Sequence, residues 1–140
     1  MILLDTNVIS EQMRQQPLDA VMQWFDSIEG TTIYLSAITE AELLRGIMTM
    51  PEGKAKSMRA EALEDILSNV FAGFILPFDS QSAHFYAEIF KLRKNYGRPI
   101  SAFDCMIAAI ARSNDCKLAT RNVLDFEYFG VDIINPWEFI

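Results

Sequence analysis

Residues 2–10 read Ile2-Leu3-Leu4-Asp5-Thr6-Asn7-Val8-Ile9-Ser10, so a short apolar run leads directly into a carboxylate, a hydroxyl and an amide. An apolar run of this length predicts a buried strand of a parallel sheet, covered by helices on both faces. Ligand sites of open α/β sheets gather at the carboxyl ends of the strands. We therefore expect Asp5 at such a site, with the alternative that it only caps the next helix, because Asp is a favoured N-cap.

Strand and helix patterns alternate along the rest of the chain. β-branched and aromatic runs predict four further strands, at residues 32–36, 74–78, 117–120 and 132–135. Helical spacing predicts helices at 8–13, 17–29, 38–48, 54–71, 82–95 and 101–114, with a helical turn at 123–126. Alternation of this kind implies right-handed βαβ units. The expected fold is α/β, a three-layer α/β/α arrangement with a central, mostly parallel sheet of about five strands, in a single domain over residues 1–140.

The composition is that of an ordinary globular protein, with 51% hydrophobic and 22% charged residues, which argues against disorder. The formal net charge of −7 counts against broad, sequence-independent binding to nucleic acid and suits divalent cations or a basic protein partner. The N-terminal apolar run is too short for a signal peptide, and the run 70–76 is too short for a membrane span. Cys105 and Cys116 match no metal-binding spacing. We therefore expect a cytoplasmic protein.

Acidic or amide side chains occur in four places near the carboxyl end of an expected strand or in the first turn of the helix that follows. They are Asp5, Glu42, Asp104, and Asn122 with Asp125. Each has a structural alternative, because Thr39-x-x-Glu42 and Ser101-x-x-Asp104 both fit a capping box, and Asn122 with Asp125 fits the same spacing. Carboxylates in a first helical turn also complement the helix dipole. Any one of them could therefore be a cap.

The set as a whole favours a site. Asp104 shares its helical stripe with Ala108 and Ala111, so the carboxylate is expected to face packed structure, where an unpaired charge is costly. Several carboxylates brought together repel one another unless a cation neutralises them. An all-oxygen cluster suits Mg²⁺ or Mn²⁺. Such an ion lowers the pKa of a bound water and stabilises charge on a phosphoryl group.

These motifs resemble those of PIN-domain ribonuclease toxins of the VapC/FitB-like type, which belong to bacterial toxin–antitoxin pairs. The resemblance covers the whole chain in order and rests on four motifs: Ile2 to Ser10, Leu35 to Thr39 with Glu42-Leu43, Ile100-Ser101 with Asp104-x-x-Ile107-Ala108-Ala109, and Ala119 to Asn122 with Asn135-Pro136-Trp137. It implies an endoribonuclease that hydrolyses RNA phosphodiester bonds with Mg²⁺ (or Mn²⁺). It also implies a homodimer inhibited by a cognate antitoxin protein, with DNA bound only indirectly through that antitoxin and no membrane partner.

Carried onto this chain, the resemblance assigns the metal-binding acids to Asp5, Glu42 and Asp104. The fourth catalytic position holds Asn122, where some relatives carry Asp, and this neutral amide favours one well-occupied ion over two. Three more residues are expected to support the site: Asn7, Thr120 and Asp125. Glu40 is a rival to Glu42, which only the motif match favours.

Several other residues are candidates with ordinary alternatives. Arg45, Arg98 and Arg121 flank the motifs and are candidate RNA phosphate contacts, or solvated surface residues. The methionines near the break at residues 51–53 are expected in the core, with a groove for a partner helix as the alternative; they are Met48, Met50 and Met58. Three residues are expected to be inert, namely His84 on the surface, Cys105 as a buried thiol and Asp79 as an N-cap.

Two other functions fit parts of the pattern. A catalytically weak or silent PIN-fold binding module, acting through dimerisation and an antitoxin, is suggested by the neutral Asn122. A haloacid-dehalogenase-like phosphohydrolase also places an Asp after its first strand, but its motif needs a second Asp where this chain has Asn7. The metal-dependent ribonuclease toxin accounts for all four motifs and is the favoured interpretation.

Overall fold

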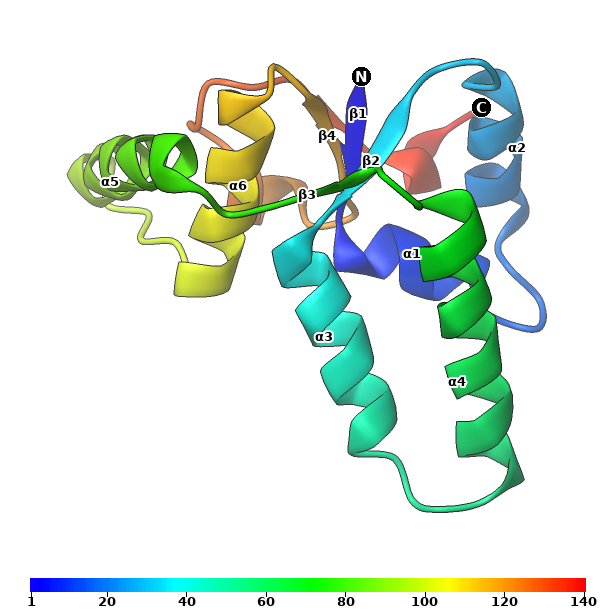
Figure 1. The fold of residues 1–140 in the computed structure, drawn as a ribbon. Helices are drawn as coiled ribbons and strands as arrows, with labels where there is room; N and C mark the ends of the chain where they lie inside the picture. Colours follow the sequence, from blue (N-terminus) through cyan, green and yellow to red (C-terminus); the bar gives the residue numbers. More distant parts are fainter.

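A five-stranded parallel sheet forms the centre of the computed structural model, which describes all 140 residues. The strands are β1 (Ile2–Leu4), β2 (Ile33–Ser36), β3 (Ile75–Leu76), β4 (Lys117–Ala119) and β5 (Ile133–Ile134). Their order across the sheet is β3-β2-β1-β4-β5, and every neighbouring pair is parallel. β1 therefore lies in the middle, and the chain adds strands outward on both of its sides (Figure 1).

Helices cover both faces of this sheet, so the expected three-layer α/β/α fold is confirmed. The helices are α1 (Thr6–Gln12), α2 (Asp19–Ser27), α3 (Ala37–Met48), α4 (Lys54–Asp65), α5 (Ser80–Asn95) and α6 (Ala102–Ser113). Short 3₁₀ turns follow β4 and β5, at Val123–Phe126 and Pro136–Glu138. Figure 1 shows α5 and α6 on one side of the sheet and α1, α2 and α4 on the other. None of these helices has both the length and the apolar character that crossing a bilayer requires.

The alternation of side chains along β1 builds two separate cores. Leu3 belongs to a buried cluster with α6 and the Val123–Phe126 turn, whereas Ile2 and Leu4 belong to a second cluster with α1, α2 and α3. Ile2, Leu3 and Leu4 are each at most 5% exposed. An uninterrupted apolar run is what a strand covered on both faces requires, and it explains why three residues suffice to hold the centre of the sheet.

The helix expected over residues 54–71 differs in its last turn. Its α-helical part ends at Asp65, and Ile66–Val70 form a π-helical turn in which the backbone N–H of Phe71 donates to the carbonyl of Ile66. The wider turn accompanies the burial of Phe71, which is 1% exposed, beside Leu63. Hydrophobic spacing alone does not distinguish such a turn from a continuing α-helix.

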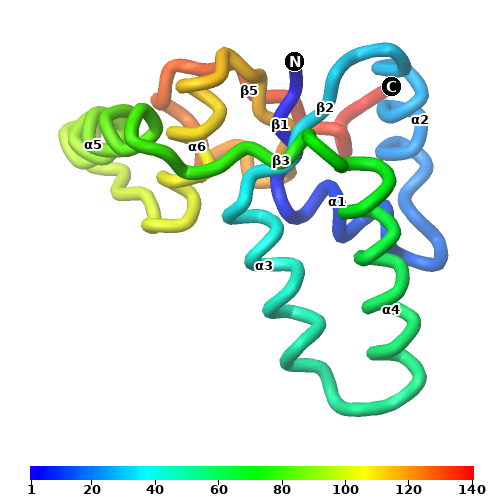
Figure 2. The backbone as a smooth tube through the Cα atoms, viewed as in Figure 1, coloured from blue at the N-terminus to red at the C-terminus, as the bar shows by residue number.

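α3 and α4 form a hairpin that projects away from the sheet (Figure 2). The methionines near its tip are not in the core as expected: Met48 is 73% and Met58 is 54% exposed. The reason is geometric, because residues 49–53 connect the two helices beyond the edge of the second core, and no element covers them. Met58, together with Met50, instead borders a groove, described below.

Candidate active site

Four segments meet at the carboxyl edge of the sheet. β1 ends at Asp5, β2 ends at Ser36 where α3 begins, and β4 leads into Thr120. α6 brings its first turn to the same edge, with Ser101 as its N-cap. The side chains of Asp5, Ser36 and Ser101 each cap the helix that follows, so three of the four junctions are fixed locally.

Asp5 is the buried carboxylate at the centre of the site, with 5% of its surface exposed. Its Oδ1 accepts a hydrogen bond from the backbone N–H of Thr6 at 2.8 Å. Its Oδ2 accepts from the Thr120 hydroxyl at 2.8 Å and from Asn7 Nδ2 at 3.2 Å. Asp5 is therefore both the N-cap of α1 and a fixed acidic group, so the two roles considered for it coexist.

The environment of Asp5 disfavours its negative charge. Burial is the largest cause and raises the pKa of the Asp5 carboxyl from 3.8 to about 6, although the hydrogen bonds from Thr120 and Thr6 oppose this. The nearby charges of Asp104 and Glu42 raise the pKa further. The structure thus brings the three expected acids within electrostatic range of one another.

Glu42 reaches the site through a hydroxyl of α1. Thr6 Oγ1 donates to Glu42 Oε1 at 3.1 Å and lies 3.3 Å from Thr39 Oγ1. The capping box considered for Thr39 and Glu42 is wrong, because the residue that caps α3 is Ser36, whose hydroxyl accepts from the Thr39 N–H at 3.0 Å. Glu42 is consequently free of any cap and turns toward Asp5, a position that Glu40 does not share.

Asp104 lies in the first turn of α6, where its backbone N–H donates to the hydroxyl of Ser101 at 3.2 Å. The capping role of Ser101 is thus confirmed, and the Asp104 carboxylate is left half-buried. Burial is the main cause that raises the pKa of Asp104; the charge of Asp125 adds to it and the charge of Arg93 opposes it. Asp125 therefore lies close to Asp104, which supports its place beside the site.

The Asn7 side chain and the Thr120 hydroxyl connect the ends of β1 and β4. Asn7 Oδ1 accepts from the backbone N–H of Arg121 at 3.2 Å, while Asn7 Nδ2 lies 3.5 Å from Thr120 Oγ1. Thr120 Oγ1 also accepts from the backbone N–H of Asn122 at 3.0 Å. The Asn122 side chain itself is exposed at the rim. These bonds tie the loop after β4 to the first turn of α1.

The three candidate phosphate contacts are exposed, and each guanidinium lies over an aromatic ring. The distances to the ring centroids are 5.6 Å for Arg45 over Phe103, 5.4 Å for Arg121 over Trp137 and 5.8 Å for Arg98 over Tyr128. Arg98 additionally pairs with Glu127 at 3.1 Å. Stacking holds the side chains while leaving N–H groups free to bind an anion.

Arg93 and Thr6 are two contributors that the sequence analysis missed. Arg93 is 4% exposed and donates to three backbone carbonyls, those of Arg98, Asp125 and Glu127, at 2.7–2.8 Å. It thereby fixes the loop after β4 against the end of α5. No local motif marks such a residue, although an arginine within the apolar face of α5 is a sequence signal for a buried, hydrogen-bonded guanidinium.

The expectations for the remaining polar residues are confirmed. His84 is exposed on α5. Burial raises the pKa of the Cys105 thiol to about 11, which makes it a poor nucleophile. Asp79 caps α5 by accepting from the Ser82 N–H at 2.9 Å. None of them takes part in the site.

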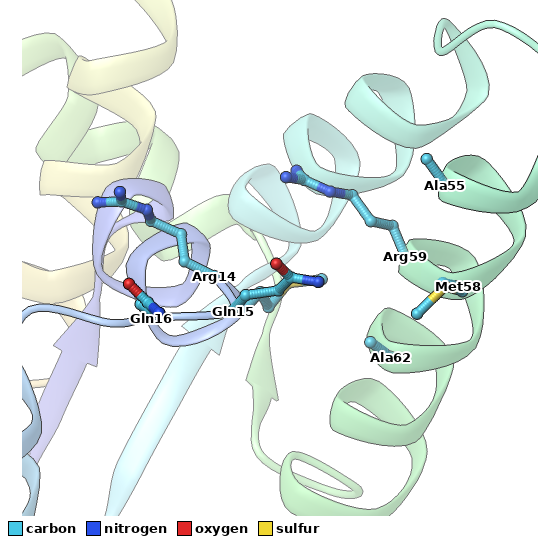
Figure 3. A pocket seen from close by; sticks show the side chains of 8 residues that line it. Arg14, Gln15, Gln16, Ala55, Met58, Arg59 and Ala62 are labelled. Atoms are coloured by element: carbon cyan, nitrogen blue, oxygen red, sulfur yellow. The ribbon is translucent and has the colours of Figure 1, made fainter.

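A groove runs from the acidic residues into the hairpin. A cavity of about 390 Å³ is lined by Thr6 and Glu42 at one end and by Met50 and Arg59 at the other. A second cavity of about 600 Å³ continues between the end of α1 and α4, where Met58 and Arg59 face it. Figure 3 shows Arg59 reaching from α4 across this space toward α3. The groove alternative for the methionines is therefore the better description.

The donor set suits a hard divalent cation, with water completing its shell. No three Asp, Glu, His or Cys side chains converge closely enough to hold an ion by themselves. However, Asp5, Glu42 and Asp104 present only oxygen donors, and none of them forms a salt bridge. Mg²⁺ retains several waters and needs only one or two direct carboxylates, so this looser set fits it. A cation would also relieve the repulsion that raises the Asp5 pKa.

Comparison with known proteins places this arrangement in a family. The chain matches the PIN domain over residues 2–126, which is most of its length. This protein belongs to the PIN domain family. The PIN domain is 46% identical over 137 residues to Toxin FitB of Neisseria gonorrhoeae (strain ATCC 700825 / FA 1090), a match that covers 98% of this chain and 99% of that protein.

Two further relatives agree with this assignment. The PIN domain is 44% identical over 138 residues to VapC ribonuclease Y4jK of Sinorhizobium fredii (strain NBRC 101917 / NGR234), with 99% of each chain covered. Its fold is similar to a solved structure of FitAB bound to an IR36 DNA fragment, with a TM-score of 0.93, 44% identity and coverage of 100% of this chain and 98% of that one. The expected VapC/FitB-like type is thus confirmed, and the dehalogenase-like alternative is set aside.

Proposed function

We propose that this PIN domain is a Mg²⁺- or Mn²⁺-dependent endoribonuclease, the toxin of a cytoplasmic toxin–antitoxin pair. The observation that carries the proposal is the buried Asp5 carboxylate, whose pKa rises to about 6 in a site where Asp104 and Glu42 add negative charge. Such a cluster of acids is stable in its charged form only beside a cation. The relative named VapC ribonuclease Y4jK supports the choice of RNA as substrate.

Each residue of the acidic site then has a distinct role. Thr120 and the Thr6 N–H hold Asp5 in one orientation, and Thr6 Oγ1 does the same for Glu42. Asp104 completes the acidic set from α6. A Mg²⁺ or Mn²⁺ ion held by one or two of these carboxylates and by water would supply a water activated near neutral pH and stabilise charge on the phosphoryl group.

The residues at the rim act on the substrate. Arg45 and Arg121 are exposed, close to the acidic set along the chain, and orient phosphates by charge-assisted hydrogen bonds. Asn122, at the same edge, offers an amide that hydrogen-bonds substrate or water without adding negative charge. Its neutrality limits the site to one well-occupied ion in this proposal.

The test is cleavage of a structured RNA pool by the purified, antitoxin-free protein, with Mg²⁺, Mn²⁺ or EDTA. We expect discrete products with either ion, none with EDTA, and none from Asp104→Asn or Asp5→Asn. Asp26→Asn is the matched control, because Asp26 is an exposed carboxylate on α2, away from the site. Equal cleavage by all three variants would place the chemistry elsewhere.

A catalytically silent binding module is the second candidate. Two observations favour it: the neutral Asn122 and the absence of three converging acidic ligands. Titration calorimetry with Mn²⁺ discriminates, because a nuclease site releases or takes up heat that Asp5→Asn abolishes. No heat and no cleavage would select the binding module.

The cognate antitoxin is proposed to occupy the groove between α1, α3 and α4. Methionines adapt well to a partner helix, and Met50 and Met58 border this space. A basic arm of the partner would complete the acidic end, and DNA would be bound only through the antitoxin. Binding should weaken at higher salt; affinity that is independent of salt would exclude a charge-driven contact.

A homodimer is proposed to form through the outer face of α5. Phe90 is 44% and Phe78 is 36% exposed. Tyr86 lies between them, stacked on Phe90 with ring centroids 6.3 Å apart and edge-to-face with Phe78 at 6.0 Å. An exposed aromatic row of this kind marks an interaction surface.

A further inference from the structure

The end of α5 and the turn that follows concentrate positive charge. Between Glu88 and Asp104 the chain has four cations and no carboxylate: Lys91, Arg93, Lys94 and Arg98. A third of the twelve Lys and Arg residues thus lies within eight positions of a protein with a net charge of −7. All but Arg93 are exposed. This segment is therefore a local exception to the acidity of the molecule.

Two exposed tyrosines stack on each other in the same region. The rings of Tyr96 and Tyr128 have centroids 4.7 Å apart and planes inclined by 14°. Their exposed fractions are 59% and 46%, so the stack lies at the surface. Because one face of Tyr96 contacts Tyr128, its exposed area includes the opposite face, which is free for another planar group.

The stack is held in place by the surrounding structure. Tyr128 has a φ of 61°, in the left-handed region that a bulky residue rarely adopts. The buried Arg93 guanidinium fixes both halves of the stack, because it donates to the carbonyl of Glu127 at 2.7 Å and to that of Arg98 at 2.7 Å. Strain maintained by a buried side chain indicates a functional position.

The stacked pair of Tyr96 and Tyr128, called the platform below, is connected to the acidic site through both of the segments that carry it. The turn that carries Tyr96 and Arg98 leads directly into Ser101, the cap of the helix that carries Asp104. Arg93 donates to the carbonyl of Asp125 at 2.8 Å as well as to that of Glu127 beside Tyr128. Both segments that carry the two rings are therefore joined directly to the segments that carry Asp104 and Asp125.

We propose that Tyr96, Tyr128 and Arg98 bind a single-stranded segment of the RNA next to the scissile bond, with one base stacked on Tyr96. This rests on the proposed ribonuclease function. Aromatic faces beside cations are the features that bind unpaired nucleotides irrespective of sequence. The local positive charge complements phosphates. The exposed Arg98–Glu127 ion pair contributes little stability, so Arg98 can replace Glu127 by a phosphate at low energetic cost.

The test measures RNA binding separately from cleavage. Fluorescence anisotropy follows a labelled, short, mixed-sequence single-stranded RNA with Asp5→Asn protein in EDTA. We expect Tyr96→Leu to weaken binding about tenfold, since a stacked base contributes this much, and Tyr96→Phe to bind like its parent. Phe74→Leu is the matched control, because Phe74 is a 40% exposed aromatic residue at the opposite edge of the sheet. Lys94→Gln should reduce the salt dependence of binding.

Kinetics of the active protein separate this inference from the proposed function. If the wild type cleaves RNA, Tyr96→Leu should raise KM and leave kcat unchanged, whereas an unchanged KM would overturn the platform and leave the nuclease intact. If the wild type cleaves no RNA, the proposed function fails. The RNA affinity of the Asp5→Asn protein, with and without Tyr96→Leu, then still tests the platform. Loss of self-association or antitoxin binding in Tyr96→Leu, with RNA affinity intact, would assign the tyrosines to a protein interface and overturn the inference.

Discussion

Asp5 makes the stability of the metal-free protein depend on pH. Its pKa is about 6 in the folded chain, against 3.8 for an unperturbed Asp. Between these values the folded state binds more protons than the unfolded state, so stability falls as pH rises from about 4 to 6 and then levels off. The integrated effect is roughly 3 kcal/mol, from a shift of about two units.

Asp5→Asn removes this dependence. In EDTA the variant should become more stable than the wild type by up to roughly 3 kcal/mol as pH rises from 4 to 7, measured by urea unfolding at each pH. Mn²⁺ should reduce the difference in unfolding free energy between the two proteins at pH 7, because it stabilises only the wild type. A constant difference between the two proteins at every pH would contradict the burial argument.

Arg93 is the residue whose loss the fold should tolerate least. Arg93→Met leaves three backbone carbonyls without their donor, and hydrogen bonds to a charged group contribute about 1.5–3 kcal/mol each. We expect a loss of roughly 3 kcal/mol or more in the free energy of unfolding. Arg112→Met is the control, because its pair with Glu88 is exposed; a similar cost for both variants would remove the special role of Arg93.

The start of α3 depends on a single buried hydroxyl. Ser36→Ala removes the cap that accepts from the Thr39 N–H and should cost about 1 kcal/mol of stability. Ser68→Ala, at an exposed serine that makes no side-chain hydrogen bond, should change stability by less than about 0.5 kcal/mol. Thermal unfolding of both proteins makes the comparison, and equal melting temperatures would show that another group caps the helix.

The projecting hairpin should open more readily than the helices packed on the sheet. α4 buries only Leu63, whereas α6 buries six residues. Local opening is governed by such differences in buried apolar contact. Amide hydrogen exchange should therefore be faster in α4 than in α6, and antitoxin binding should slow it selectively in α4. Uniform protection of both helices would contradict this.

The hydrophobic patterns predict every strand and helix, but they fail where a contact between distant segments decides the outcome. The π turn before Phe71 depends on where Phe71 packs in the core. The capping of α3 by Ser36, and the release of Glu42 toward Thr6, depend on how α1 and α3 meet. Asp5, Asp104 and Thr120 could be placed because their strand and helix ends are marked locally.

The whole molecule is expected to be a dimer formed by the aromatic face of α5. Phe90→Glu places a charge in that face and should yield monomers in sedimentation velocity at concentrations where the wild type is dimeric. Leu18→Glu is the control, because Leu18 is 46% exposed at the start of α2, on the other side of the sheet from α5 (Figure 1), and this variant should remain dimeric. Dimers of both variants would move the interface to another surface.

The central position of β1 also governs when the site comes into existence during synthesis. Asp5 leaves the ribosome early, but the Thr120 hydroxyl that holds it lies 115 positions later in the chain. β1 likewise pairs with β4, whose residues are translated near the end. At a translation rate of about 5–20 residues per second, several seconds separate the two. A product truncated before Lys117 therefore lacks both the strand that pairs with β1 on this side and the hydroxyl that holds Asp5.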